Sequence, residues 1–148
     1  MSQRVKVLVT ALKMISDEKH WAKGVGAIDS GGAPVKTTDP RAVAWCAIGA
    51  LDRAAGNDSE LFESCLQLLQ KASLQLFRCD PAVINDHTNH SGLVEMYTRA
   101  IQLASRERQA ARSGRVSAPH RRPPAGDNGY VQSQLRLVAA PASAHEAF

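Results

Sequence analysis

The sequence predicts a mainly α-helical fold, with four helices in a compact domain and a small β-hairpin between the first and second of them. Two observations support this fold class. Apolar residues recur at helical spacing in several segments of residues 1–104, and glycine and proline interrupt that pattern strongly only between residues 24 and 34. We therefore expect one helical domain, residues 1–104, followed by a disordered basic tail, residues 105–148.

The first helix and the hairpin are predicted from local patterns. Val5, Leu8, Leu12 and Ile15 share one helical face, which predicts an amphipathic helix over about residues 4–17. Two short apolar pieces follow, at residues 27–28 and 34–35, and the sequence Asp-Ser-Gly-Gly lies between them. Glycine accepts the positive φ that tight hairpin turns require, so this segment is expected to form a two-stranded ribbon.

The second helix is expected to begin at Asp39. An aspartate can accept hydrogen bonds from the free amides of a first helical turn, and Pro40 follows where a missing N–H costs nothing. The residues from Val43 to Ala54 are almost wholly apolar, which indicates a helix in the middle of a bundle. Gly49 would let another backbone approach closely.

The third helix is predicted over about residues 59–77, with apolar residues on an arc of roughly 180°. Packing against two neighbouring helices is the favoured explanation, and an exposed apolar strip that binds a partner or a second copy is the alternative. A fourth helix, about residues 91–104, is expected to be capped by Asn89. The segment of residues 80–86 between these helices is predicted to be an extended crossing segment.

Several of these residues together resemble a known family. The chain carries Trp21 and the glycines of the ribbon, then the helix W-C-x-x-G-A-L of residues 45–51, then the Asn85-Asp86 pair, then Arg-Ala-Ile at residues 99–101. In this order and spacing they are similar to a family of small uncharacterised bacterial and phage proteins, a domain of unknown function. The resemblance covers about residues 5–104 and implies a shared helical fold, but no activity, substrate or cofactor. Gly92 stands where that family often has glutamate, which weakens the capping box and leaves Asn89 as the main cap.

The composition is typical of a globular protein from a reducing compartment. The 44% hydrophobic and 5% aromatic content is that of a globular protein. Three cysteines without a CxxC pair favour neither a disulfide framework nor a zinc site, so a reducing compartment is expected. The sequence shows no secretory signal and no membrane span, so a cytoplasmic location without a membrane partner is expected.

Cys46 is the candidate nucleophile. A tryptophan-cysteine pair followed by His87 and His90 suggests a thiol-dependent hydrolase. Counted from a cap at Asp39, however, Cys46 would lie two turns inside an apolar helix, beyond the reach of the helix dipole. A structural thiol is therefore favoured over a catalytic one.

The other candidates are polar or aromatic. The segment of residues 86–90 has carboxylate and imidazole groups, but a helix-capping loop explains them better than a metal site, so no metal and no cofactor is expected. If Asn85 and Asp86 are buried beside Trp21 or Trp45, their side chains would pin the crossing segment of residues 80–86 to the hairpin through backbone hydrogen bonds. The alternative is a ligand-binding cluster of these four residues.

Charge is distributed unevenly along the chain. Residues 1–104 carry 11 basic and 11 acidic residues, so the net charge of +4 arises wholly from residues 105–148. The arginines there either end the last helix as a solvated segment or form a basic arm that binds nucleic acid weakly. The nucleic-acid candidates are Arg106, Arg108, Arg112, Arg115, Arg121 and Arg122.

The favoured function is that of a noncatalytic interaction or accessory protein, acting on a protein partner or by self-association. The domain lacks a convergent catalytic set, whereas the third helix and the tail offer binding surfaces. The hydrolase and nucleic-acid hypotheses stay open as alternatives.

Overall fold

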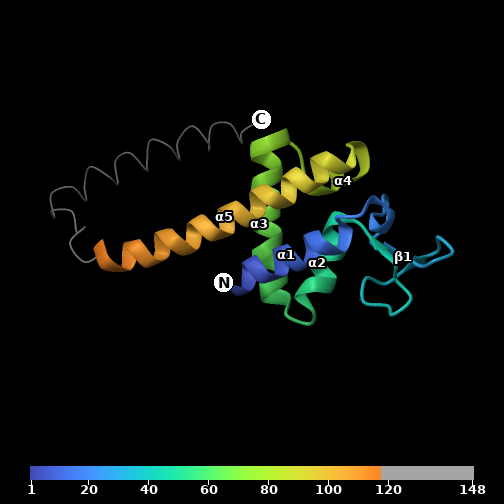
Figure 1. Cartoon of the computed structure of the whole chain (residues 1–148), viewed down its shortest axis with the longest axis horizontal. Helices are drawn as coiled ribbons and strands as arrows, with labels where there is room; N and C mark the ends of the chain where they lie inside the picture. The colour runs from blue at the N-terminus through green and yellow to red at the C-terminus, as the bar shows by residue number, and fades with distance from the viewer. Residues whose placement is uncertain (118–148) are drawn as a thin grey trace, which may run out of the picture. The chain divides into compact units, whose positions relative to one another are not determined.

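The computed structural model describes residues 1–117, and within them the chain forms five α-helices, a short 3-10 helix and three two-residue strands (Figure 1). In chain order the elements are α1 (Gln3–Ile15), η1 (Glu18–His20), β1 (Ala27–Ile28), β2 (Pro34–Val35), β3 (Ala44–Trp45), α2 (Ala47–Ala55), α3 (Ser59–Phe77), α4 (Pro81–His87) and α5 (His90–Ser117). The mainly helical fold with a β-hairpin is confirmed. The count of four helices is wrong, because α4 adds a fifth.

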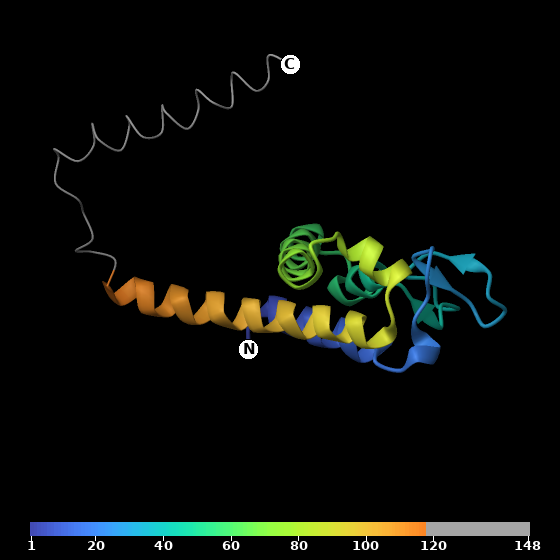
Figure 2. The same ribbon diagram turned by 90° about the horizontal axis from the view of Figure 1, so that it is seen from above.

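Helices α1 and α5 run antiparallel along one side of the helical domain. Arg4 at the start of α1 forms an ion pair with Glu107 at 3.0 Å, and the carbonyl of Ile15 at its end lies 2.7 Å from His90 Nε2. Figures 1 and 2 show the two helices side by side, with α3 crossing behind them. Between these layers lies one apolar core, and its largest fully buried side chains include Tyr97, Leu8, Ile15, Leu51, Leu69, Leu93 and Met96.

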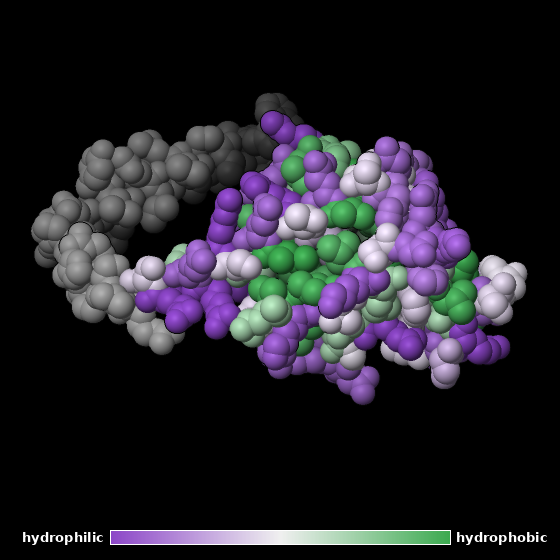
Figure 3. All heavy atoms as spheres, viewed as in Figure 1, coloured by the Kyte–Doolittle hydropathy of each residue, from purple (hydrophilic) through white to green (hydrophobic). Residues whose placement is uncertain are grey.

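The prediction for α3 is confirmed in its bounds and in its packing. Asp58 caps the helix by accepting a hydrogen bond from Leu61 N at 2.9 Å, and α3 contacts α1, α2 and α4. Its apolar arc is therefore mostly covered, although Leu74 and Leu76 stay exposed. In the view of Figure 3, apolar side chains gather instead on the face over α1 and α5.

The hairpin is also confirmed, with an added strand. β1 pairs antiparallel with β2 and, on its other edge, with β3, so the strand order is β2-β1-β3. Asp29 closes the turn by accepting hydrogen bonds from Gly31 N and Ala33 N, each at 2.9 Å. The third strand comes from a segment that was predicted to be helical.

The predicted start of the second helix at Asp39 is wrong. Asp39 and Pro40 belong to a turn in which Asp39 accepts from Arg41 N at 2.8 Å, while Ala44 and Trp45 pair with β1. The helix begins only at Ala47, with Cys46 as its N-cap. Aspartate forms such short-range hydrogen bonds in turns as readily as at helix starts, and here the strand pairing decides between the two.

The segment before α5 is helical rather than extended, so that prediction is wrong too. Asp80 caps α4 by accepting from Ala82 N at 2.9 Å, and Pro81 occupies the first turn. Asn89 caps α5 as predicted, accepting from Gly92 N at 3.0 Å.

The last helix continues well beyond residue 104. Residues 105–117 are helical, so the prediction of a disordered tail is wrong for that part, and residues 118–148 lie outside the described residues. The chain divides into two units, Met1–Ala110 and Ala111–Phe148. No helix in the described part of the chain is both long and apolar enough to cross a membrane.

Candidate functional site

Asn85, on the buried side of α4, joins three parts of the fold. Its Oδ1 accepts hydrogen bonds from Trp21 Nε1 at 2.7 Å and from Ala47 N at 2.8 Å. Its Nδ2 donates to the carbonyl of Ala22 at 3.1 Å and to Asp86 Oδ1 at 2.8 Å. Asn85 is 2% exposed, and its amide thereby connects the segment after η1, the start of α2 and α4 itself. Asn85 is buried and does fasten its segment through hydrogen bonds, but the segment is a helix, Asp86 is half-buried, and the partners are Trp21, Ala22 and Ala47 instead of the hairpin strands.

Asp86 lies next to this hub and is half-buried. Its Oδ1 also accepts from Gly24 N at 2.9 Å. The bond from Asn85 contributes most to lowering the pKa of Asp86 below its ordinary value, followed by the bond from Gly24 and the nearby charges of His87 and Lys23. Asp86 is therefore ionised at neutral pH. In the described part of the chain, its Oδ2 has no hydrogen-bond partner.

Cys46 lies at the start of α2, not two turns inside a helix. Its Sγ accepts a hydrogen bond from Gly49 N at 3.2 Å and so caps the helix. Burial raises the pKa of Cys46 above its ordinary value, and the negative charge of Asp86 raises it further, against the opposing effect of the backbone amides of Gly49 and Ile48. The thiol is protonated at neutral pH even though it lies at a helix N-terminus.

A small pocket of about 220 Å³ lies where the loop after η1, the start of α2 and α4 meet. We call it the junction pocket; it is lined by Gly24, Val25, Gly26, Cys46, Ile48, Ala82, Asn85 and Asp86. Because the Asn85 amide is fully engaged in structural bonds, the polar groups left for a ligand are the Asp86 carboxylate and the Cys46 thiol. The remaining walls are apolar or backbone.

The two histidine candidates do not join Cys46. His90 Nε2 lies 2.7 Å from the carbonyl of Ile15, and its ring centroid is 5.4 Å from that of Trp21. His87 is exposed at the end of α4, and neither histidine lines the junction pocket. Residues 1–117 also contain no group of three or more histidine, cysteine or acidic side chains placed to hold a metal ion.

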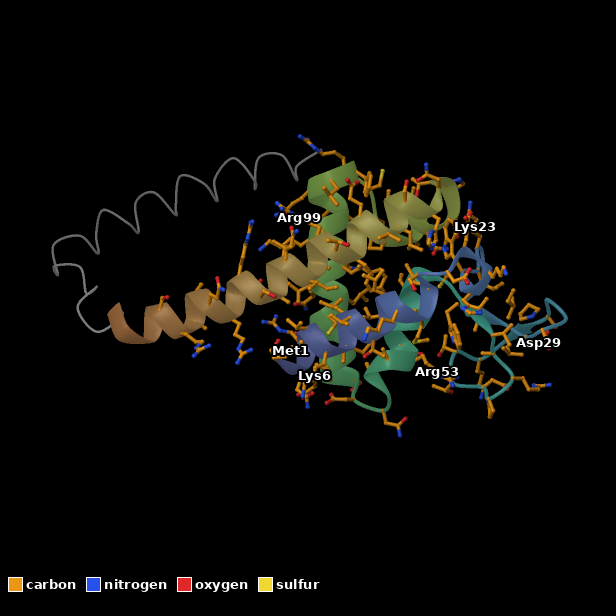
Figure 4. All side chains as sticks on the ribbon, viewed as in Figure 1. Met1, Lys6, Lys23, Asp29, Arg53 and Arg99 are labelled. Carbon is orange, nitrogen blue, oxygen red and sulfur yellow. The ribbon has the colours of Figure 1, made fainter. Side chains whose placement is uncertain are left out.

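The two tryptophans are half-buried and satisfy their indole N–H groups within the fold. Trp21 donates to Asn85, and Lys23 Nζ lies 4.7 Å from the centre of its ring. Trp45 donates to the carbonyl of Thr37 at 3.0 Å, with Arg53 stacked at 5.4 Å. Figure 4 shows Lys23 close to α4 and Arg53 on α2, below the hairpin. Neither tryptophan lines the junction pocket, and Trp21 is joined to it through its hydrogen bond to Asn85.

Four of the six arginine candidates lie in the part of the chain that the structure describes. Arg106, Arg108 and Arg112 are exposed on α5, and Arg115 lies in the same helix. Arg121 and Arg122 lie outside the described residues. The intervening Glu107 is paired with Arg4 at 3.0 Å and faces Lys71 at 3.9 Å.

Sequence reasoning missed the pocket wall formed by Val25 and Ala82, because it depends on how α4 packs against the ribbon. Gly49 was a usable signal. A Cβ built on it would lie 2.1 Å from the carbonyl oxygen of Gly26, so only glycine allows the ribbon to approach α2 this closely. The bond from Cys46 N to that same oxygen, at 3.0 Å, depends on the approach.

Comparison with known proteins gives a family but no activity. A family model described as a family of unknown function (DUF6197) matches residues 2–103. No curated protein and no solved structure matches this chain. The matched range contains every residue of the junction pocket.

Proposed function

Because the chain belongs to DUF6197, a family of unknown function, we propose from its geometry that it is a noncatalytic interaction protein that recognises its partner through the junction pocket. One observation carries the proposal. The Asp86 carboxylate lines this pocket beside apolar walls, and one of its oxygens makes no hydrogen bond to the described residues. The neighbouring Asn85 amide, by contrast, is fully hydrogen-bonded within the fold. A charged group next to an apolar hollow is the usual composition of a binding site.

The state of Cys46 supports a noncatalytic role. Thiol hydrolases need a thiolate and a base within hydrogen-bond reach of it. Here burial raises the pKa of Cys46, its Sγ is engaged by Gly49 N, and the His90 ring is bound to the carbonyl of Ile15. The thiol therefore acts as a helix cap and as part of the pocket wall.

The size of the pocket supports a protein partner over a metabolite. Pockets for drug-sized ligands have about 300–1,000 Å³, whereas the junction pocket has about 220 Å³. A volume of this size suits one side chain of a partner whose remaining contacts lie outside the pocket.

The proposal is tested by titrating the ¹⁵N-labelled full chain with a set of Nα-acetyl amino-acid N-methylamides bearing apolar, aromatic, acidic and basic side chains. We expect at least one of them to shift the amide resonances of Gly24, Val25 and Gly26 saturably. Ala82→Trp should abolish those shifts, since Ala82 lines the pocket.

Val83→Trp is the matched control, because Val83 is the next residue of α4, is 45% exposed and does not line the pocket. Binding that survives in Ala82→Trp, or a set in which no compound shifts these amides, would overturn the proposal.

A second candidate function, nucleic-acid binding, is supported by the length of α5. Helical structure through Ser117 places Arg108 and Arg112 one turn apart on an exposed surface. Glu107 does not offset this charge, because it is paired with Arg4. Such a basic helix would bind phosphates without sequence preference.

This second function predicts that the full chain binds fluorescent single-stranded DNA with an affinity that falls steeply between 50 and 200 mM salt, on the order of tenfold or more. The triple variant Arg106→Gln, Arg108→Gln, Arg112→Gln should lose most of that binding. Unchanged anisotropy curves for the variant would exclude the helix as the binding surface.

A further inference from the structure

We propose that the side chain which the junction pocket accepts from its partner is a lysine, with its ammonium group on Asp86 Oδ2 and its methylene stem on the apolar wall of Ile48 and Ala82. This inference rests on the proposed function and goes further by naming the chemistry of the partner. It is carried by the composition of the pocket and by the hydrogen bonds that Asp86 already makes.

The apolar part of the pocket requires a ligand with an aliphatic stem. Ile48 and Val25 are half-buried, and they face the pocket together with Ala82 and the glycines. Lysine and arginine side chains lay their methylene groups on apolar surface while the charged end stays in contact with water. A ligand that was only charged would leave this wall uncovered.

The charge of the pocket requires a cation. Asp86 is its one ionised side chain, and the Cys46 thiol beside it is neutral. A carboxylate oxygen accepts hydrogen bonds and donates none, so the complementary group is a protonated nitrogen. The described contacts leave Oδ2 free for it.

The geometry favours lysine over arginine. A guanidinium binds a carboxylate best through two parallel hydrogen bonds, one to each oxygen. Oδ1 of Asp86 already accepts from Gly24 N at 2.9 Å and from Asn85 Nδ2 at 2.8 Å. Only one oxygen is left, and a single oxygen suits the compact ammonium of lysine.

Lys23 of this chain is a competing cation. Its charge acts on Asp86, but its Nζ donates to the carbonyl of Thr88 at 3.3 Å and lies over the Trp21 ring. Lys23 is therefore held beside the pocket instead of in it, and its positive charge weakens the attraction that an incoming lysine feels. Removing that charge should strengthen binding.

The test compares two probes that share an aliphatic stem and differ in the terminal ammonium, on the full chain and by the same amide shifts. Nα-acetyl-lysine N-methylamide carries the ammonium, and the norleucine derivative carries the same stem without it. We expect the lysine derivative to bind up to about fivefold tighter, the range of a solvent-accessible ion pair. The arginine derivative should bind no tighter than lysine, and Lys23→Gln should raise the affinity for lysine alone.

Asp86→Asn is the decisive variant, because an asparagine oxygen can still accept from Gly24 and Asn85 and so preserves the fold. It should reduce lysine binding to the level of norleucine and leave norleucine unchanged. Asp80→Asn, at the cap of the same helix, is the matched control and should change neither.

Equal binding of the two probes, or lysine binding that persists in Asp86→Asn, would overturn the lysine assignment while leaving the pocket as a binding site. Butylammonium binding as tightly as the lysine derivative would contradict a protein partner and point to a free alkylamine. A pocket that binds neither the norleucine nor the lysine derivative, nor any other compound of the set, would overturn the proposed function as well.

Discussion

The helical core and the polar junction are held together by different forces. In the core, side chains such as Leu8, Leu51 and Leu69 are fully buried and gain stability from non-directional apolar burial. At the junction, one amide, that of Asn85, forms four hydrogen bonds to groups from three segments. The core therefore tolerates changes that conserve volume, whereas the junction tolerates only changes that conserve each donor and acceptor.

The two regions also have different roles: the core mainly provides stability, and the junction forms the proposed binding site. Apolar packing in the core brings α4 and α2 into contact. The hydrogen bonds at the junction then hold the Asp86 carboxylate in place at the pocket between them. Asn85 binds both Asp86 and the start of α2. The shape of the pocket therefore depends on the hydrogen bonds of this one side chain.

The largest effect is expected from Gly49→Ala. The new Cβ would lie 2.1 Å from the carbonyl oxygen of Gly26 and 2.9 Å from its carbon, and backbone atoms cannot yield as a side chain can. We expect destabilisation of about 3 kcal/mol or more in urea unfolding. Gly114→Ala, at a helical glycine with open space around it, is the control and should be neutral or stabilising by up to about 1 kcal/mol.

Asn85→Asp and Leu69→Met test the comparison directly. The aspartate places a second carboxylate oxygen against the carbonyl of Ala22 and against Asp86 Oδ1, where the amide nitrogen donated before. The other oxygen can still accept from Trp21 and Ala47, but a buried negative charge that lacks a counter-charge and faces a second carboxylate should cost about 3 kcal/mol. Leu69→Met, a volume-conserving swap at a fully buried site, should cost less than about 1.5 kcal/mol. Equal losses in denaturant unfolding would remove the distinction between the two regions.

A smaller effect is expected at the boundary of the two regions. Tyr97 is fully buried in the core, and its hydroxyl donates to the carbonyl of Ala47 at 2.5 Å, next to the amide that Asn85 binds. Tyr97→Phe conserves the ring and removes this bond, so we expect a loss of about 1–2 kcal/mol in the free energy of unfolding. A loss below a few tenths of a kcal/mol would show that the core alone positions α2.

The smallest effect is an alkaline loss of stability. Burial raises the pKa of Cys65 to about 11 from 9.0 and raises the pKa values of Cys46 and Tyr97 as well. Above pH 9 the unfolded chain loses these protons while the folded chain keeps them, so stability is unaffected below pH 9 and falls as the pH rises toward the folded pKa values.

For Cys65 alone the loss is on the order of 1 kcal/mol by pH 10.5, allowing for solvent screening. Urea unfolding at pH 7.5, 9 and 10.5 measures it, and Cys65→Ala should flatten the profile. A stability that rises with pH over this range would contradict buried, protonated thiols.

Two Asp-Pro dipeptides show what the sequence could and could not predict. Both Asp39-Pro40 and Asp80-Pro81 carry the signals of a helix start, yet only the second begins a helix, α4. The first forms a turn because Ala44 and Trp45 pair with β1, a contact between segments far apart in the chain. Local signals therefore predicted α1, α3, the hairpin and the Asn89 cap of α5. The local signal of α4 was also present in Asp80-Pro81, although the segment was predicted to be extended, whereas the start of α2 depended on the pairing of β3 with β1.

The candidate site was predictable only in part. The polarity of Asn85 and Asp86 beside apolar neighbours indicated a buried hydrogen-bonded pair; both side chains are hydrogen-bonded, but only Asn85 is buried. Cys46 was misplaced because cysteine is not a usual capping residue, so no pattern marks it as the start of α2. The interpretation of Cys46 as a structural thiol was thus drawn from the wrong position in the helix, and it is now supported by burial.

The most direct test of a noncatalytic Cys46 is its rate of reaction with iodoacetamide at neutral pH, measured by peptide mass spectrometry in the native protein and in the urea-unfolded chain. A half-buried, protonated thiol that caps α2 should react more slowly in the native protein than in the unfolded chain. A markedly faster native rate would show an activated thiolate and contradict the noncatalytic account.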